Sequence, residues 1–214
     1  MTENVLNIIN VINVINIQRH WRGLFLRKKL TKLQDNMTPI LLLESLNLYN
    51  NIIQTEKKIN NSLKNKKIRY SNFPSHISEN IVKFVFAKKY GVMPTWETKV
   101  GDLCLFHNET RFIKIEVKGS IDLSNGPSSF GPTECWDYLY FVDGVDHEKN
   151  FFKVYEIKLS NNSKEWKNIK VSKTDTYENQ CFQKRRPRVN FKEIYKQLGE
   201  NCSLIFNDNI LNLF

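Results

Sequence analysis

Apolar and polar residues alternate along residues 101–118, on both sides of a polar turn at residues 107–110. A period of two is typical of β-strands, and a short polar turn between two such runs favours an antiparallel pair. One face of the predicted pair carries Asp102, Glu116 and Lys118. The other face carries the apolar residues Leu103, Leu105, Ile113, Ile115 and Val117. The apolar face can pack in a core, which leaves the carboxylates facing a cleft.

Helices are predicted on both sides of this strand pair. Residues 4–34 contain no Pro, and Asn recurs at every third position near their start, so the polar stripe of this helix winds around it. A second helix begins with Thr38 as N-cap and Pro39 at the first helical position, an arrangement that favours helix initiation. Two further helices are predicted over residues 80–90 and 190–199, because a Gly closes each of them.

Two more strands are predicted at residues 137–142 and 151–158, and residues 203–206 can add a short edge strand. The sheet therefore has at least four strands. We predict an α/β (α+β) fold, in which a central mixed β-sheet is flanked by helices and preceded by an N-terminal helical extension. The boundary is placed near residue 68, so residues 1–67 form the extension and residues 68–214 form the main domain.

The composition is that of a folded, basic protein. Of the 214 residues, 41% are apolar and 12% aromatic, which is ample for a buried core. The net charge of +10 favours a polyanionic partner, because Lys and Arg contacts with phosphates release condensed counterions. Nucleic acid is the leading candidate, and a solvated basic surface is the alternative. The Lys- and Asn-rich segment 57–67 is either a linker or a basic contact for a DNA backbone.

Four cysteines, at positions 104, 135, 181 and 202, show neither CxxC pairing nor zinc-finger spacing. We expect them to be reduced and buried. The apolar N-terminus has no basic n-region and is interrupted by Asn, so neither a signal peptide nor a membrane span fits. The protein is therefore expected to be intracellular.

The face with Asp102, Glu116 and Lys118 has the side chains needed to hydrolyse a phosphodiester bond. Two hard carboxylates and phosphate oxygens suit an octahedral Mg²⁺, which neutralises developing charge and lowers the pKa of bound water. Lys118 can position or deprotonate that water, or stabilise the pentavalent centre. The alternative is that Glu116 and Lys118 form an exposed charge pair on the solvent side of the sheet.

An Asp on one strand, followed by Glu-x-Lys at the end of the next, resembles the PD-(D/E)XK nuclease superfamily, and most closely its type II restriction endonucleases. The resemblance rests on PSHISENI before the site, EVKGSIDLSNGPSSFGPTECWDYLYFVDG through it, and KRRPR with a helix after it. It spans about residues 70–200, and Gly101 stands where the superfamily motif has Pro. It implies a Mg²⁺-dependent enzyme that cuts double-stranded DNA at a short specific site, usually as a homodimer on a palindrome.

The resemblance also implies roles for individual residues. Asp102 and Glu116 carry the metal, Lys118 is the catalytic lysine, and Glu79 matches an acidic residue of the preceding helix. For Glu79, the alternative is that an acid in the first helical turn merely complements the helix dipole. We expect DNA contacts from the Gly- and Pro-rich loop 119–132 and from the basic cluster of KRRPR. The residues are Asn125, Ser128, Ser129, Lys184, Arg185, Arg186 and Arg188.

Within the first predicted helix, the segment IQRHWRGLFLR resembles the IQ motif, IQxxxRGxxxR, which binds calmodulin or related EF-hand light chains. Its fixed positions are Ile17, Gln18, Arg22, Gly23 and Arg27. The alternative is a basic amphipathic helix that packs on its own domain or on a second subunit. A virus of eukaryotes would reconcile this motif with a restriction-type nuclease, and the enzyme would then act in the host cell.

Two other functions stay open from the sequence. One is a structure-specific or non-specific repair nuclease of the same superfamily. The other is a non-enzymatic adaptor, in which the IQ-like helix docks a light chain and the C-terminal domain binds DNA. Digestion of a plasmid separates them, because discrete fragments indicate site specificity and the absence of Mg²⁺-dependent cutting favours the adaptor.

Overall fold

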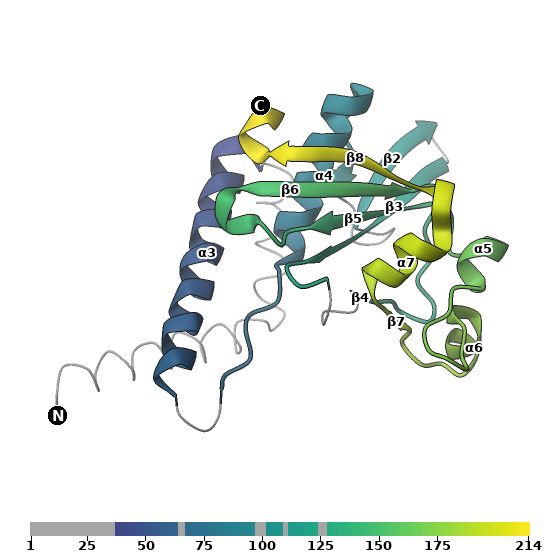
Figure 1. Cartoon of the computed structure of the whole chain (residues 1–214). Helices are drawn as coiled ribbons and strands as arrows, with labels where there is room; N and C mark the ends of the chain where they lie inside the picture. The colour runs from purple at the N-terminus through teal and green to yellow at the C-terminus, as the bar shows by residue number, and fades with distance from the viewer. Residues whose placement is uncertain (1–36, 64–66, 97–101, 109–110, 124–127) are drawn as a thin grey trace, which may run out of the picture. The chain divides into compact units, whose positions relative to one another are not determined.

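A six-stranded mixed sheet lies at the centre of the described part of the chain (Figure 1). The structure is a computed structural model, and it describes residues 37–63, 67–96, 102–108, 111–123 and 128–214. The strand order is β1-β2-β3-β5-β6-β8, in which only β3 and β5 are parallel among the pairs described. The strands are β1 (Thr95–Trp96), β2 (Leu103–Asn108), β3 (Arg111–Ser120), β5 (Tyr138–Asp143), β6 (Phe151–Ile157) and β8 (Cys202–Asn209). This confirms the predicted mixed sheet flanked by helices.

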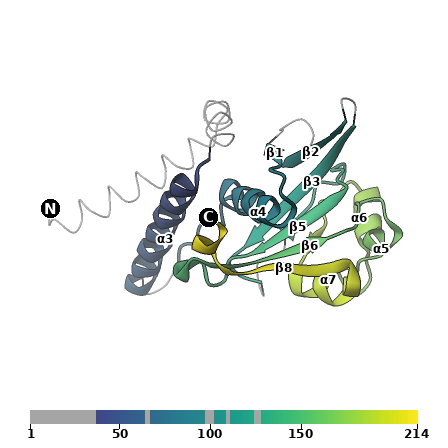
Figure 2. The same ribbon diagram turned by 90° about the horizontal axis from the view of Figure 1, so that it is seen from above.

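Helices lie on both faces of the sheet. Figure 2 shows α4 between α3 and one face, and α5, α6 and α7 at one end of the opposite face. The helices are α3 (Pro39–Ser62), α4 (Ser75–Tyr90), α5 (Lys164–Lys167), α6 (Tyr177–Phe182) and α7 (Phe191–Leu198), with the 3-10 turns η1 (His147–Lys149), η2 (Gly199–Asn201) and η3 (Ile210–Leu213). Two short strands, β4 (Ser128–Ser129) and β7 (Arg188–Val189), form a separate two-stranded sheet.

The start of α3 follows the sequence prediction. Thr38 is the N-cap, and its hydroxyl accepts a hydrogen bond from the amide of Leu41 at 3.3 Å. The buried face of α3 repeats at helical spacing and packs on α4 and η1. Its apolar members are Leu42, Leu46, Tyr49 and Ile53. The compact unit begins at Thr38, so the boundary that the sequence suggested near residue 68 falls inside it.

The helix α4 begins at Ser75, five residues before the predicted start, and ends as predicted with Gly91 in the left-handed region at φ +72°. Its N-terminal half is buried on every side, from Ile77 to Lys83. The cause is the close approach of α4 to β3. A Cβ on Gly119 of β3 would lie only 2.8 Å from the Cβ of Ser78, so the helix can sit there only against a glycine. This contact fixes the helix turn that carries Glu79.

The central strand β5 is buried on both faces. Tyr140 packs edge to face on Phe86 of α4, with ring centroids 6.0 Å apart. On the opposite face Phe141 stacks on Phe191 of α7, with centroids 3.8 Å apart. A strand covered on both sides is nearly continuously apolar, as the segment YLYFV is. The β5 strand therefore separates an α4 face of the sheet from an α7 face.

An aromatic core joins the segments beside the α7 face. Rings from four separate segments pack within 6.4 Å of one another between centroids, and the residues are Phe130, Trp136, Trp166 and Tyr177. Residues 172–189 are mostly polar. They nevertheless contain α6, which begins after the N-cap Thr176. Tyr177 anchors this short helix in the aromatic core, which explains why so polar a segment is helical.

The four cysteines are all free, which agrees with the expected reduced state. Cys104 and Cys202 are buried as expected, whereas Cys181 is only half-buried. Cys135 is exposed, so the prediction of burial was wrong for this residue, which lies in the loop before β5. Among the described residues, no helix has both the length and the apolar character needed to cross a membrane.

Candidate active site

Asp102 is fixed against β3 by a backbone contact. Leu103, the first residue of β2, pairs with Ile115, so Asp102 lies opposite Glu116 just beyond the strand. The carboxylate of Asp102 accepts a hydrogen bond from the amide of Val117 through Oδ2 at 2.8 Å. A carboxylate held by a backbone amide is strongly constrained. This side-chain hydrogen bond to β3 takes the place of a backbone hydrogen bond that β2 would make if it extended further.

Glu116 and Lys118 lie on the same face of β3, as alternation predicts. They are opposite Leu139 and Phe141 of β5, so both point to the α7 face. The ammonium of Lys118 hydrogen-bonds Oε1 of Glu116, and it also lies 5.2 Å from the centroid of the Phe130 ring. The side chain of Lys118 is largely buried, so the pair is not the solvent-exposed one that the alternative interpretation required.

Glu79 reaches the same group of carboxylates from α4. Its side chain is buried, and the indole Nε1 of Trp96 donates a hydrogen bond to its Oε2 at 3.0 Å. Burial, followed by the negative charge of Asp102, raises the pKa of Glu79 to about 8. Because α4 starts at Ser75, Glu79 lies beyond the first helical turn, and complementing the helix dipole does not account for its burial.

The carboxylates perturb one another. Burial and the charge of Asp102 raise the pKa of Glu116 to about 7, although Lys118 opposes this shift. Burial is also the main cause of the raised pKa of Asp102. Burial would lower the pKa of Lys118, but Glu116 and Asp102 more than compensate, so its pKa is raised. The site thus holds more buried negative charge than its single lysine neutralises, which is the environment a cation stabilises.

The donor set fits Mg²⁺ by its chemistry. Protein Mg²⁺ sites usually use one or two carboxylates, and water and substrate phosphates supply the other oxygens. Asp102 and Glu116 meet this requirement. In the described part of the chain, no three His, Cys, Asp or Glu side chains are already arranged around one metal position. Glu116 in particular is engaged by Lys118 and would have to share or exchange that contact.

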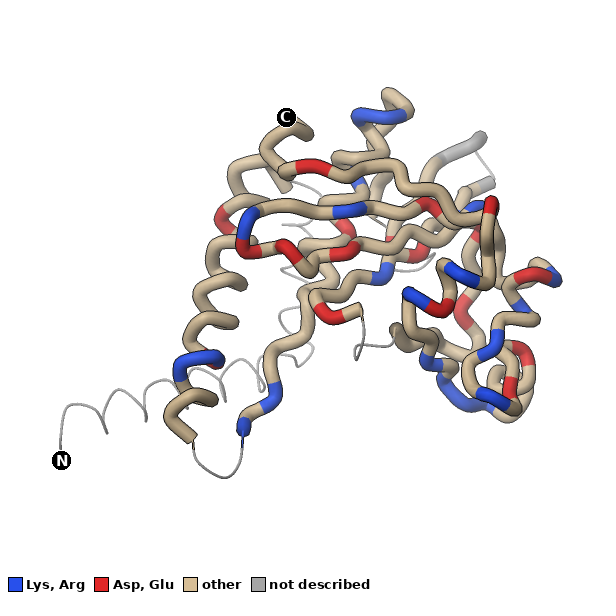
Figure 3. Tube along the Cα trace, viewed as in Figure 1, with Lys and Arg blue, Asp and Glu red and all other residues tan. Residues whose placement is uncertain are grey.

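The predicted DNA-contacting residues come together from two distant segments. Ser129 of β4 pairs with Arg188 of β7, and Ser128 pairs with Val189. The amide of Phe130 continues this pairing to the carbonyl of Pro187 at 3.0 Å. Figure 3 marks basic residues in blue along the chain between α6 and β7. The side chains of Lys184, Arg185, Arg186 and Arg188 are all exposed. Within the cluster, Arg188 lies in β7 with its side chain exposed.

Some predicted residues lie outside the described part of the chain. These are Asn125 of the Gly- and Pro-rich loop and the IQ-like positions Ile17, Gln18, Arg22, Gly23 and Arg27. Binding of calmodulin or a related EF-hand protein therefore stays a prediction from the sequence.

The sequence prediction missed Glu134, which follows the Gly- and Pro-rich loop. Its carboxylate lies 3.7 Å from the guanidinium of Arg186, and its charge contributes to the raised pKa values of Asp102, Glu116 and Lys118. Glu134 lies within a segment on which the resemblance rests, but the sequence assigned it no role. Its only sequence signal is that it is the first acid after the loop beside the site.

A mixed sheet flanked by helices, with carboxylates and a lysine at the junction of β2 and β3, is consistent with a restriction-endonuclease-like core. A family model described as Bsp6I restriction endonuclease matches residues 44–198, and the chain belongs to this family of type II restriction endonucleases. The chain is 30% identical over 132 residues to Type II restriction enzyme Bsp6I of Bacillus sp. (strain RFL6). The aligned region covers 62% of this chain and 70% of that enzyme. No solved structure matches the chain.

Proposed function

We propose that this chain is a Mg²⁺-dependent type II restriction endonuclease of the PD-(D/E)XK superfamily. It hydrolyses phosphodiester bonds of double-stranded DNA at a short specific site. The observation that carries the proposal is the contact of Asp102 with the amide of Val117, which holds its carboxylate beside the Glu116–Lys118 pair. Membership of the Bsp6I family supports the choice of DNA cleavage among phosphodiester reactions.

Asp102 and Glu116 would hold the metal, which when bound supplies charge neutralisation and a more acidic water. Asp102 is already oriented by its backbone donor, so it loses little further freedom on binding. Lys118 carries a proton at its Nζ at neutral pH, because the carboxylates raise its pKa. It can therefore orient the attacking water and stabilise the charge that builds on the phosphoryl oxygens. The buried Glu79 adds a further acid that can hold a proton near the site.

Double-stranded DNA would lie along the β4 and β7 strands. These strands present the exposed cations of the cluster and the half-buried Ser128 and Ser129 on one small sheet. Cations bind phosphates without reading sequence, whereas arginine and serine side chains can also bond base edges. We propose that the enzyme acts as a homodimer, since a two-fold pair of active sites can cut both strands of a palindrome.

The test is incubation of the purified full chain with plasmid DNA and Mg²⁺, followed by mapping of fragment ends. The same reaction with EDTA and with Lys118→Ala serves as the control. Discrete fragments that require Mg²⁺ and Lys118 support the proposal. A smear would indicate a non-specific nuclease, and DNA binding without cleavage would indicate the adaptor. Sedimentation with and without the mapped site measures whether the active form is a dimer.

A further inference from the structure

Residues 67–71, which lie between α3 and α4, have neither helical nor strand structure, yet side chains of α3 fix their backbone. We call this segment the linker arm. Asn60 donates from Nδ2 to the carbonyl of Ile68 at 3.0 Å, and its Oδ1 accepts from the amide of the same residue at 2.7 Å. Glu56 accepts from the amide and from the hydroxyl of Ser71, at 2.8 and 2.6 Å. The linker arm is therefore held near both of its ends.

This anchoring is more than a connection between two helices requires. Glu56 and Asn60 are buried, with 5% and 3% of their surfaces exposed. Tyr49 is also buried, and its hydroxyl donates to the carbonyl of Ser71 at 3.2 Å. Burying a polar side chain is costly unless it finds hydrogen-bond partners, and these three side chains find theirs in the linker arm. The course of the arm is thus a specific feature of the fold.

The anchored backbone presents two cations to solvent. Lys67 and Arg69 are exposed, and neither takes part in any of the ion pairs that join described residues. In the basic cluster, by contrast, Arg185 and Arg186 each lie within 4.0 Å of an acid. Cations on an ordered backbone lose less conformational freedom on binding an anion than cations on a flexible loop. The net charge of +10 favours a polyanion as that partner.

Phe73, two residues after the linker arm, places the arm near the end of β3. A Cβ on Gly119 would lie only 2.8 Å from Cδ1 of Phe73, so this ring sits against the residue that follows Lys118. Successive residues of a strand point to opposite faces, so Phe73 and Lys118 lie on opposite faces of the sheet. On the face of Lys118, the ring of Phe130 lies 5.2 Å from the ammonium, and Phe130 directly follows β4. The linker arm and the small sheet of β4 and β7 therefore lie near the same end of β3, beside opposite faces.

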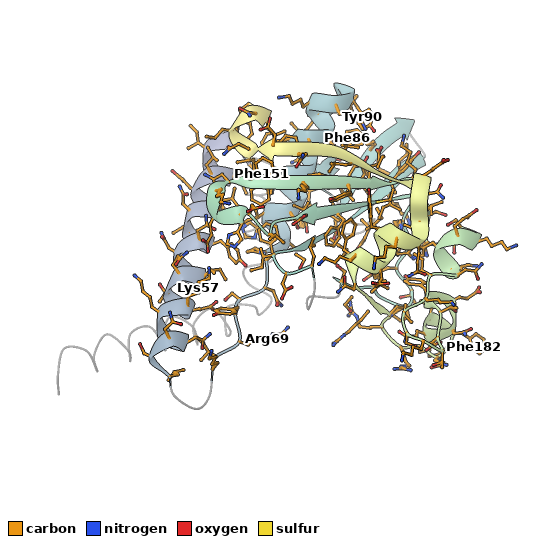
Figure 4. The ribbon with its side chains drawn as sticks, in the orientation of Figure 1. Lys57, Arg69, Phe86, Tyr90, Phe151 and Phe182 are labelled. Carbon is orange, nitrogen blue, oxygen red and sulfur yellow. The ribbon has the colours of Figure 1, made fainter. Side chains whose placement is uncertain are left out.

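We propose that the linker arm is a second DNA-binding element, in which Lys67 and Arg69 contact phosphates while the basic cluster contacts others. This inference rests on the proposed function. Figure 4 shows Arg69 and Phe182, the last residue of α6 before the cluster, both in the lower part of the view. Phosphate contacts fix the register and direction of a duplex. Two separated groups of contacts hold the duplex at one angle across the end of β3, whereas a single group on β4 and β7 would leave it free to pivot.

The experiment measures the affinity of the full chain for one DNA duplex in EDTA over a range of salt concentrations, so that cleavage does not enter. The arm variants are Lys67→Gln, Arg69→Gln and the combination of both. Each single variant should flatten the slope of log affinity against log salt by about 0.9, and the combination by about 1.8, because each cation releases the counterions of one phosphate. Unchanged slopes would show that the two cations only solvate the surface, which would overturn the inference.

Lys88→Gln is the matched control for charge. Lys88 is exposed in the last turn of α4, whereas the linker arm precedes the first turn, and the helix from Ser75 to Lys88 spans roughly 20 Å. The variant removes the same unit of charge as each arm variant and should leave the salt slope unchanged. An equal flattening in Lys88→Gln would show that the slope follows net charge alone, and it would also overturn the inference.

Asn60→Leu tests whether the anchoring of the arm prepares it for DNA. It removes both hydrogen bonds to Ile68 and leaves every cation in place, so the salt slope should stay that of the wild type. The affinity should fall by about tenfold at each salt concentration, because the arm must then be ordered on binding. The melting temperature is measured first, so that affinity is compared where the variant is folded. A lower melting temperature with wild-type affinity would show that the anchors only join the two helices.

The proposed function is tested separately, by Mg²⁺-dependent cleavage of the plasmid by the wild type. A chain that cleaves DNA while its arm variants keep the wild-type slope refutes the linker arm alone. A chain that binds DNA with the expected slopes but does not cleave it refutes the nuclease alone. A wild type that binds no duplex would overturn both.

Discussion

Glu116 on β3 and Glu156 on β6 are buried in the same sheet to a similar extent, with 7% and 3% of their surfaces exposed, yet their pKa values move in opposite directions. Burial alone would raise both pKa values. For Glu116 the nearby Asp102 adds to this effect, and the pKa rises to about 7. For Glu156 other groups outweigh burial, and the pKa is lowered. The difference lies in the partners that the fold provides on each face.

The partners of Glu156 come from the α4 face. The hydroxyls of Tyr140 and Tyr90 both donate to its Oε1, at 2.6 and 2.7 Å, and Lys89 and Lys158 lie 3.6 and 3.5 Å from its Oε2. Figure 4 shows Tyr90 beside Phe86 at the C-terminal end of α4, where this group of side chains is assembled. The charge of Glu156 is therefore balanced by two hydroxyl donors at Oε1 and by two ammonium groups near Oε2, although Oε2 itself accepts no hydrogen bond from the described residues.

The partners of Glu116 do not balance the charge around it. Lys118 donates to its carboxylate, and the same lysine is shared with Asp102 and Glu134 through their charges. The fold places two hydroxyls and two ammonium groups around Glu156, but it places two further acids, Asp102 and Glu134, near Glu116. Excess buried charge is expected where a ligand completes a site, so this contrast supports the proposal that Glu116, and not Glu156, belongs to the active site.

The strongest test of this contrast is removal of the charged groups on the α7 face. Asp102→Ala, Glu116→Ala and Lys118→Ala should each lower DNA cleavage by about 10³-fold or more, because transition-state charge loses its partners. The melting temperature should be kept in the two carboxylate variants, since these acids repel one another in the folded state. Glu156→Ala is the matched control and should cleave at the wild-type rate at 25 °C. Wild-type cleavage by any of the three variants would remove the active-site assignment.

Removal of the carboxylate on the α4 face should have the opposite result. Glu156→Ala leaves two tyrosine hydroxyls and two lysines without their acceptor, and breaking a buried charged network of this kind costs about 3 kcal/mol. For a unit of this size the melting temperature should fall by about 6–12 °C. Thermal unfolding at pH 7.5 measures the loss. A fall as large in Glu116→Ala would mean that both glutamates are structural.

The contrast also shows what the sequence could predict. Asp102, Glu116 and Lys118 lie on or beside β2 and β3, which are adjacent both in the chain and in the sheet, so a period of two was enough to bring them together. Glu156 obtains its partners from α4, β5 and the end of β6. The alternation of residues along β6 places Glu156 on one face of the sheet. The sequence does not reveal which helix covers that face, or that the hydroxyl of Tyr90 reaches Glu156.

Local sequence patterns were also insufficient to predict the structure around the α7 face. The helices α5 and α6 have four and six residues, too few for a helical period to show, and they are held by Trp166 and Tyr177 in the aromatic core. The β4 and β7 strands have two residues each, and their pairing joins Ser128 to Val189, far apart in the chain. Glu134 acquires its position from these tertiary contacts, which explains why no local pattern identified it.

The pH dependence of stability should distinguish the two kinds of acid. The pKa of Glu79 is raised from 4.5 to about 8, so between these values the folded state keeps a proton that the unfolded state has lost. Stability from this group is therefore present below about pH 4.5 and is lost as the pH rises toward 8. In EDTA, Glu79→Gln should melt about 4 °C or more above the wild type at pH 8.5 and at nearly the same temperature at pH 4.

Glu156→Gln is the matched control for this pH experiment. The pKa of Glu156 is lowered in the folded state, so its contribution is present at high pH and is lost as the pH falls through that pKa. This variant should therefore melt below the wild type at pH 8.5. A gain for both variants, or a loss for both, would contradict the distinction between an acid whose buried charge is not balanced and an acid whose charge is balanced by donors and lysines.

The smallest expected effect comes from removing one tyrosine hydroxyl from Glu156. Tyr90→Phe deletes the donor at 2.7 Å while the hydroxyl of Tyr140 stays in place, and Tyr90 is 40% exposed, so the loss should be only about 1 kcal/mol. Tyr140→Phe should cost more, because that side chain is 1% exposed and no water can replace its hydroxyl. Both losses should shrink as the pH falls through the lowered pKa of Glu156, since each hydroxyl stabilises the ionised carboxylate. Urea unfolding of the two variants at pH 8 and at successively lower pH measures this, and losses that stay constant down to the lowest pH at which the wild type is folded would show that the hydroxyls do not favour the ionised carboxylate.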